Sequence, residues 1–339
     1  MRGTNTARKA PLIVALILGL AGCSLADNPV VRWAAPAKSP TSPSSASSSP
    51  PAPRESGAAP GPDTPAPSPS PSSPSPSSPS SSSPAPSSPA ASIRLTVADA
   101  RKEAAAWVAR HNELIKDPDW WDEQARADTL FAEGTRHEVV IDRGHVSDGK
   151  KGRARRPIRL TGKQTYYVPR DQPDTGEWFM LQATYRGQDR AHLLAFWRAR
   201  GESFKLAAKT PLHYGQRVPA PRLDAEGYAS AAPMATGGAI AREYMIFWDY
   251  DQHKKAGKNG YRLAEDNYSR RAYATVSKGV YAGYQSFGTP WGFVTRDGGS
   301  VFLFSMLNHP KSIWQVLTVA TYVRKGSKEI QELAGDWYA

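Results

Sequence analysis

A run of cations is the densest group of residues in this sequence that could bind a ligand. Five positive charges fall within seven residues, at Lys150, Lys151, Arg153, Arg155 and Arg156. Cations this close repel one another, so the segment is expected to lie in solvent unless an anion neutralises it. Near a charged surface each cation contributes about 1 kcal/mol to binding. The run therefore predicts an anion-binding loop for phosphates or anionic lipid, and a solvated surface loop is the simpler alternative.

Tryptophans next to charged or turn residues form a second set of candidates. Flat rings with hydrogen-bonding groups beside them suit sugar faces and cationic or apolar ligands, as at Trp120, Trp121, Trp178 and Trp291. His111 lies on the apolar face of a predicted helix, where it could line the same pocket. A hydrophobic core is the competing interpretation for the ten Trp, because each buried aromatic side chain removes a large apolar surface from water.

Residue patterns that indicate catalysis are sparse. Ser147 and Lys150 satisfy the Ser-x-x-Lys spacing, but Ser147 falls in a predicted loop rather than at the start of a helix. The seven histidines show no metal-binding spacing. One cluster combines histidine with carboxylates, and exposed polar residues where a strand meets a loop explain it more simply than a metal site; it comprises His137, Glu138, Asp142 and His145.

Paired carboxylates that flank a cleft are the requirement for glycoside hydrolysis. Asp117, Asp119 and Asp122 bracket Trp120 and Trp121, on which a sugar ring could stack. Closely spaced Asp residues around a proline are also ordinary in turns and helix caps. The sequence therefore predicts no catalytic residue, no metal site and no cofactor.

The charge of the chain favours anionic partners. Its 339 residues include 43 Lys+Arg and 31 Asp+Glu, a formal net charge of +12, and residues 93–339 hold 37 of these cations against 28 of the acids. Such a balance suits lipid head groups, wall polyanions, acidic glycans or nucleic acid. Cys23 is the only cysteine, so no disulfide and no cysteine-ligated metal site can form within one chain.

The N-terminal residues have the pattern of a secretory signal peptide. Basic residues precede an apolar run over residues 12–20, which is shorter than the roughly 20 apolar residues of a membrane span. The run ends in Leu20-Ala21-Gly22-Cys23, which resembles the lipobox of bacterial lipoproteins. The resemblance implies a signal peptide over residues 1–22, lipidation of Cys23 and a location on the extracytoplasmic face of the cell membrane.

Residues 23–92 are expected to form a lipidated tether. From residue 36 onward the segment consists mainly of Pro, Ser and Ala, with hardly any bulky apolar side chain. It cannot bury enough surface to fold, so it is predicted to be disordered with polyproline-II character. Any chemistry is therefore expected beyond Ser92.

The remaining residues show helix and strand patterns in a repeated order. Thr96 to Asp99 has the pattern of a capping box and starts a predicted helix that reaches residue 114; a shorter helix is predicted over 120–131. A second long helix is predicted over 240–251. Strands are predicted over residues 164–168, 178–185, 192–200 and 204–208, and then over 271–277, 280–286, 291–295, 300–306 and 314–323.

This order predicts an α+β fold of two tandem related halves, residues 93–222 and 223–339, each a long helix packed on a curved antiparallel sheet. The segment from Tyr167 to Asp171 matches that from Phe293 to Asp297, which favours a duplication. The halves resemble NTF2-like or cystatin-like folds. Through its lipobox, its tether and the segment from His111 to Trp121, the chain also resembles uncharacterised secreted lipoproteins of high-GC Gram-positive bacteria. That resemblance implies location and architecture, and no catalytic residues.

Two functions lead among those compatible with the sequence, and a third is a partner-binding accessory or sensor subunit whose second helix provides the interface. The first is a non-catalytic ligand- or partner-binding module at the membrane–cell wall interface, which reaches the membrane through its N-terminal lipid. Its partner would be an anionic wall polymer or another envelope protein, and no nucleic acid is expected at such an address. The alternative is a cell-envelope hydrolase acting on wall glycans or another surface polymer. An aromatic or apolar pocket without a coupled acid–base pair would favour the first, and a buried Asp/Glu pair beside Trp120 and Trp121 would favour the second.

Overall fold

A computed structural model gives the structure of the chain and describes residues 95–149, 155–249, 251–258, 260–266, 268, 283–308 and 315–339. Several sequence predictions lie outside these residues. They are the signal peptide, Cys23, the tether, the strand over 271–277, and three cations of the predicted anion-binding loop, Lys150, Lys151 and Arg153.

The first half begins with the predicted capping box. The Thr96 hydroxyl accepts a hydrogen bond from the Asp99 N–H at 3.1 Å, and the Asp99 carboxylate accepts one from the Thr96 N–H at 3.0 Å. These bonds satisfy two of the donors that a helix start leaves free. Three helices then precede a four-stranded antiparallel sheet in the order β1-β2-β3-β4; the elements are α1 (Val97–Leu114), α2 (Gln124–Asp128), α3 (Glu133–Ser147), β1 (Leu160–Tyr167), β2 (Gly176–Tyr185), β3 (Ala191–Ala199) and β4 (Lys205–Pro211).

The second half places one long helix before a mixed sheet. The strand order is β5-β10-β9-β8-β6, with β7 also paired to β8, and the β5–β10 pair is parallel whereas the others are antiparallel. The elements are α4 (Met234–Trp248), the short 3-10 helix η2 (His253–Lys255), β5 (Arg262–Leu263), β6 (Ser286–Phe287), β7 (Trp291–Val294), β8 (Ser300–Asn308), β9 (Gln315–Val323) and β10 (Glu329–Tyr338).

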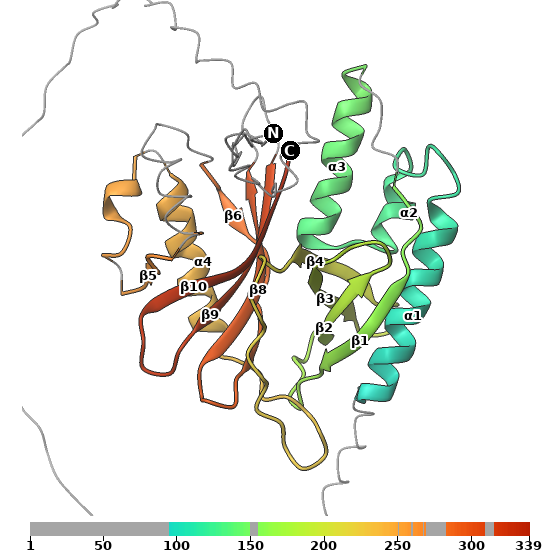
Figure 1. Cartoon of the computed structure of the whole chain (residues 1–339). Coiled ribbons are helices and arrows are strands. Elements are labelled where there is room, and N and C mark those ends of the chain that lie inside the picture. The colour runs from blue at the N-terminus through green and yellow to red at the C-terminus, as the bar shows by residue number, and fades with distance from the viewer. Residues whose placement is uncertain are drawn as a thin grey trace, which may run out of the picture. The chain divides into compact units, whose positions relative to one another are not determined.

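The two sheets pack against each other, with α1 on the outer face of the first and α4 on the outer face of the second (Figure 1). Successive side chains of a strand point to opposite faces, and β2 shows the consequence. Phe179 and Leu181 pack in the cluster around α1, whereas Trp178 and Met180 pack in the cluster between the sheets. β8 alternates in the same way between the core around α4 and the core between the sheets.

The interface between the halves contains residues from the internal sequence match. The rings of Tyr167 and Phe293 stack with centroids 4.3 Å apart and planes 6° apart, and Trp178 lies 5.4 Å from Trp291. Tyr167 and Phe293, which occupy corresponding positions of the match, therefore meet in one core. The fold class is confirmed as α+β with curved, mainly antiparallel sheets and few helices. The boundary between residues 222 and 223, the duplication and the NTF2-like resemblance stay predictions.

Helix α3 lies where the two sheets meet, in contact with β4 of the first sheet and with β8 and β9 of the second. Gly134 permits this approach, because a Cβ at that position would lie 2.0 Å from the Ser305 Oγ. The helix start is fixed to the second half by Glu133, whose carboxylate accepts hydrogen bonds from the Thr289 N–H at 3.0 Å and from its hydroxyl at 2.6 Å. Because α3 is held in this position, its polar side chains His137, Glu138 and Asp142 become buried.

The structure differs from several sequence predictions of secondary structure, and of the described residues in the strand predicted over 280–286, only Ser286 lies in a strand. Residues 133–147 form a helix, so the prediction that His137 to His145 lie exposed where a strand meets a loop is wrong; His137, Glu138 and Asp142 are buried. The predicted helix over 120–131 is reduced to the five residues of α2. Strand β10 was not predicted at all. Within the described part of the chain, no helix combines the length and the apolarity that crossing a membrane requires.

Candidate functional site

Arg155, one of the five cations of the predicted anion-binding loop, points into the fold. Its side chain is 13% exposed, and one guanidinium nitrogen lies 3.2 Å from the Asp142 carboxylate and 3.9 Å from that of Glu138. The guanidinium also lies over the rings of Trp120, at 5.1 Å, and Phe131, at 5.3 Å. Cation–π contacts of this kind gain strength when both partners are shielded from water. Arg155 therefore interacts with residues inside the fold rather than with an anion in solvent.

Two further groups complete the polar cluster beside α3. Lys209 of β4 places its ammonium 2.8 Å from the Glu138 carboxylate, and the hydroxyl of Tyr338, at the end of β10, donates to Asp142. The carboxylates of Glu138 and Asp142 are only 4% and 1% exposed. We call Glu138, Asp142, Arg155 and Lys209 the α3 ion-pair cluster. Its two negative and two positive charges balance, as a buried group of charges requires.

Asn112 of α1 holds the chain that follows the predicted loop. Its side-chain amide donates to the Ile158 carbonyl at 2.8 Å, and its side-chain oxygen accepts from the Ile158 N–H at 2.7 Å. These reciprocal hydrogen bonds to the backbone N–H and C=O of one residue resemble those between paired strands, and they fix the direction of the backbone there. Together with the inward-pointing Arg155, it anchors one end of the loop to the first half.

Four arginines lie at one end of the first sheet, and we call Arg156, Arg159, Arg186 and Arg190 the arginine strip. The Arg186 N–H donates to the Arg159 carbonyl at 2.8 Å, and Arg186 and Arg190 bound the turn between β2 and β3. Arg156, Arg159 and Arg186 are exposed. Among the described residues, the ion pairs of the arginines and lysines around this end of the sheet involve other cations, such as Arg155 and Lys209, and none of the four. The acid of that turn, Asp189, accepts a hydrogen bond from the Tyr214 hydroxyl.

The tryptophans proposed as a ligand platform are distributed over two cores. Trp120 is 1% exposed and packs against Phe131 in the core around α1, with Trp121 at its edge. Trp178 and Trp291 are 5% and 3% exposed and lie in the core between the sheets. The structure therefore does not bring these four rings to one surface.

His111 is a core residue in this structure. It is 2% exposed, its ring stacks on Trp107 with centroids 5.1 Å apart, and its Nδ1 lies 3.3 Å from the side-chain oxygen of Asn112. Burial lowers the pKa of His111 to about 4, so the imidazole is neutral at pH 7. It packs beside the α3 ion-pair cluster without adding a charge to it.

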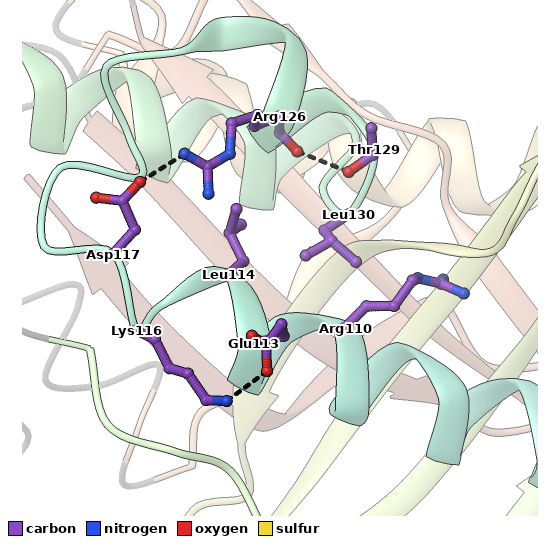
Figure 2. A pocket seen from close by; sticks show the side chains of 8 residues that line it. All are labelled: Arg110, Glu113, Leu114, Lys116, Asp117, Arg126, Thr129 and Leu130. Atoms are coloured by element: carbon purple, nitrogen blue, oxygen red, sulfur yellow. Dashed lines mark hydrogen bonds and ion pairs between the residues drawn. The ribbon is translucent and has the colours of Figure 1, made fainter.

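A surface depression of about 510 Å³ lies between the end of α1 and α2 (Figure 2). Leu114 and Leu130 supply its apolar lining, and two ion pairs lie along it: Lys116 with Glu113 at 2.5 Å, and Arg126 with Asp117 at 2.6 Å. Because these charges already pair with each other, the depression offers little unbalanced charge to a ligand.

The carboxylates show no arrangement that would act as an acid–base pair. Glu138 and Asp142 do form a buried pair beside Trp120, the condition that would favour an enzyme. However, a catalytic acid or base must reach the substrate, and these side chains are nearly inaccessible and face fixed cations. The hydrogen bond from Arg126 lowers the pKa of Asp117, which keeps that carboxylate ionised.

Two other catalytic candidates gain no support from the geometry. Ser147 is the last residue of α3, so it does not occupy the start of a helix as the Ser-x-x-Lys interpretation requires. His137, Glu138, Asp142 and His145 lie on α3, and across the described residues no three His, Cys, Asp or Glu side chains are placed to hold a metal ion. The α3 ion-pair cluster and the arginine strip are what the structure assembles instead.

Sequence reasoning missed several of these residues. Lys209 and Tyr338 join the α3 ion-pair cluster from strands remote in sequence, and no local pattern could have placed them there. Arg159, Arg186 and Arg190 each stand next to the end of a strand, and three arginines at strand ends were a signal that could have been read.

Fold and site together define an α+β protein of two packed sheets with an internal ion-pair cluster and an arginine-rich end. A family model described as "Domain of unknown function (DUF8094)" matches residues 95–332, which is 238 of the 339 residues, and the chain belongs to this family. No curated protein and no solved structure matched the chain. The matched range contains the α3 ion-pair cluster and the arginine strip, whereas Tyr338 lies beyond it.

Proposed function

We propose that the chain is a lipid-anchored protein of the extracytoplasmic face of the cell membrane, and that its folded part binds an anionic wall polymer without catalysis. The address rests on Leu20-Ala21-Gly22-Cys23 and on the signal-peptide pattern before it. The binding function rests on the arginine strip. Arginine suits this role because its planar guanidinium stays charged and binds phosphate or carboxylate through two parallel hydrogen bonds.

The observation that carries the binding proposal is the contrast between two neighbouring arginines. Arg155 is neutralised inside the fold, whereas Arg156 and the three other arginines of the strip have no ion pair with a carboxylate of the described residues. At about 1 kcal/mol for each cation near an anionic surface, the strip would supply about 4 kcal/mol, or roughly a thousandfold in affinity. Lys150, Lys151 and Arg153, which lie outside the described residues, would add to this attraction.

The hydrolase is the weaker proposal. The buried carboxylates beside Trp120 are held by Arg155, Lys209 and the Tyr338 hydroxyl, so neither is placed to exchange a proton with a polymer. A charge-balanced cluster of this kind serves to position the segments that it joins. It keeps the beginning of the strip close to the sheet.

The binding experiment reverses the charge of the strip. The chain solubilised in detergent is titrated with purified teichoic acid, once as it stands and once with Arg156→Glu, Arg159→Glu and Arg186→Glu. The matched control reverses three exposed lysines elsewhere, Lys254→Glu, Lys258→Glu and Lys325→Glu. We expect the strip variant to lose at least a hundredfold in affinity and the control less than tenfold, with binding weakened by salt. Equal losses in both variants would show a non-specific charge effect and would contradict the proposal.

A second arm separates polymer from lipid, because micelles that contain phosphatidylglycerol offer the same phosphate chemistry. Tighter binding to these micelles than to teichoic acid would replace the wall polymer by the membrane surface. The anchor is tested separately: Cys23→Ser should move the chain from the membrane fraction to the soluble fraction. Unchanged membrane association would refute lipidation at Cys23.

A further inference from the structure

Tyr214 has the most exposed large apolar or aromatic side chain of the described residues, at 53% of its surface. It lies just beyond β4, in a turn that the Gln216 N–H closes by donating to the His213 carbonyl at 3.0 Å. Gly215, with φ of 80°, supplies the left-handed backbone that this turn needs. The turn therefore presents an aromatic ring to solvent.

The backbone around Tyr214 is fixed from two sides. The His213 N–H donates to the Leu333 carbonyl of β10 at 2.9 Å, and the Tyr268 hydroxyl donates to the Tyr214 carbonyl at 2.9 Å. The rings of His213 and Tyr268 stack with centroids 3.8 Å apart and planes 9° apart. A ring on a backbone held in this way loses little conformational entropy when a ligand binds to it.

The side chain of Tyr214 contacts the turn between β2 and β3. Its hydroxyl donates to the Asp189 carboxylate at 2.9 Å, and the Arg190 guanidinium lies over its ring, 5.1 Å from the centroid. Arg190 belongs to the arginine strip, so the ring adjoins one end of the strip. Tyr214 stays 53% exposed with both contacts in place, and ring surface therefore remains open to a ligand.

We propose that Tyr214, Asp189 and Arg190 form a sugar-binding subsite at the end of the arginine strip, where one pyranose ring of the anionic polymer stacks on Tyr214. This inference rests on the proposed function, because it names a second component of the polymer that the strip attracts. The partner is then a polyanion that carries sugar rings, either as substituents or within its main chain.

The three groups supply what recognition of a sugar requires. The face of the Tyr214 ring packs against the C–H groups of a pyranose. The Asp189 carboxylate is exposed and only accepts hydrogen bonds, and the Arg190 guanidinium only donates them. One sugar hydroxyl can donate to the first while a neighbouring hydroxyl accepts from the second. A phosphate alone would leave the ring unused and would be repelled by Asp189.

The test compares two forms of one polymer. The detergent-solubilised chain is titrated with purified teichoic acid that carries glucosyl substituents, and with the same polymer after enzymatic removal of the glucose. The phosphate charge is identical, so a difference in affinity reports on the sugar. We expect about tenfold tighter binding of the glucosylated form. Equal affinity of the unaltered chain for both forms would overturn the subsite.

Replacing Tyr214 by alanine should abolish this preference and leave the affinity for the sugar-free polymer unchanged. The sugar-free arm is decisive because Tyr214 also contacts Arg190. Equal weakening of both polymers by Tyr214→Ala would show that the ring only positions Arg190, and would overturn the subsite. Tyr214→Phe keeps the ring and should retain most of the preference. A loss as large as that of Tyr214→Ala would contradict stacking.

Tyr261→Ala is the matched control. The Tyr261 ring also has a cation over it, the Lys328 ammonium at 4.5 Å, but Tyr261 lies next to β5 of the second sheet. This variant should keep the preference for the glucosylated polymer, and its loss there would contradict the assignment to Tyr214. Teichuronic acid, whose sugars lie in the main chain, then distinguishes the two sources of the ring: Tyr214→Ala weakens its binding only if a main-chain sugar stacks.

The outcome of this test can be separated from that of the proposed function, because the charge-reversal variant leaves Arg190 in place. If charge reversal abolishes binding of both polymers while Tyr214→Ala keeps the sugar preference, the subsite fails and the polymer-binding function stands. If charge reversal has no effect while Tyr214→Ala still abolishes the preference, the function of the strip fails and a sugar site remains.

Discussion

Replacing Arg155 by methionine should lower the free energy of unfolding by about 3 kcal/mol. Removing one partner of a buried ion pair costs about 3–5 kcal/mol, because the remaining charge stays buried without compensation. Asp142 and Glu138 are 1% and 4% exposed, so this penalty applies to both. The low end of the range is expected because Lys209 and Tyr338 still hold one carboxylate each. Methionine keeps an apolar stem on Trp120 and Phe131, so the loss reports on charge rather than on packing.

Urea unfolding followed by tryptophan fluorescence gives the measurement. Arg126→Met is the matched control, because Arg126 also pairs with an aspartate but both side chains are 38–40% exposed; its cost should be much smaller than that of Arg155→Met. Combining Arg155→Met with Asp142→Asn should cost less than the sum of the two single changes, since each removes a charge that the other leaves stranded. Equal losses for Arg155→Met and Arg126→Met would refute the view that the α3 ion-pair cluster stabilises the fold.

Three further changes test other contacts. Asn112→Ala removes both hydrogen bonds to Ile158 and should lower the free energy of unfolding by about 2 kcal/mol in the same assay. No measurable change would contradict a stabilising role for these two hydrogen bonds. The pKa of His111 falls from 6.5 when unfolded to about 4 when folded, so stability should be complete above pH 6.5 and decrease by about 3 kcal/mol as the pH falls to 4; His111→Gln should flatten that profile. Gly237→Ala, although favourable in an isolated helix, places a Cβ 2.6 Å from Pro290 and should lower the thermal midpoint of unfolding.

Elements with a strong local signal could be predicted from the sequence. The capping box of Thr96 and Asp99 is formed as expected, because both of its hydrogen bonds lie within four residues. The sequence predicted the ends of four strands to within two residues: β2, β3, β8 and β9. Each contains more consecutive apolar residues than a solvent-exposed segment normally has. A pattern that is shorter than one helix or strand can be recognised without knowing the rest of the fold.

Helix α3 and strand β10 could not be predicted in this way. α3 buries Glu138 and Asp142 on the face that meets the first sheet, so its sequence lacks the apolar stripe that indicates a buried helix. β10 carries Glu329, Glu332 and Asp336, and its place depends on pairing with β9 along its whole length. In both elements the stabilising partners come from distant segments, and polar residues interrupt the apolar pattern that would indicate the element locally.

The different roles of Arg155 and Arg156 follow from the helical state of α3. Glu138 and Asp142 are four residues apart, so a helix places both carboxylates on one face, where their like charges repel unless cations lie between or beside them. In a strand or a loop, Glu138 and Asp142 would not have to share one buried face, and no cation of residues 150–156 would be needed to neutralise them. Once α3 is a helix, its buried face needs about two cations, and Arg155 and Lys209 meet that need. The charge density of the sequence therefore counts Arg155 as a candidate anion-binding residue although the fold neutralises it. It also misses Arg159, Arg186 and Arg190, which lie next to the ends of β1, β2 and β3.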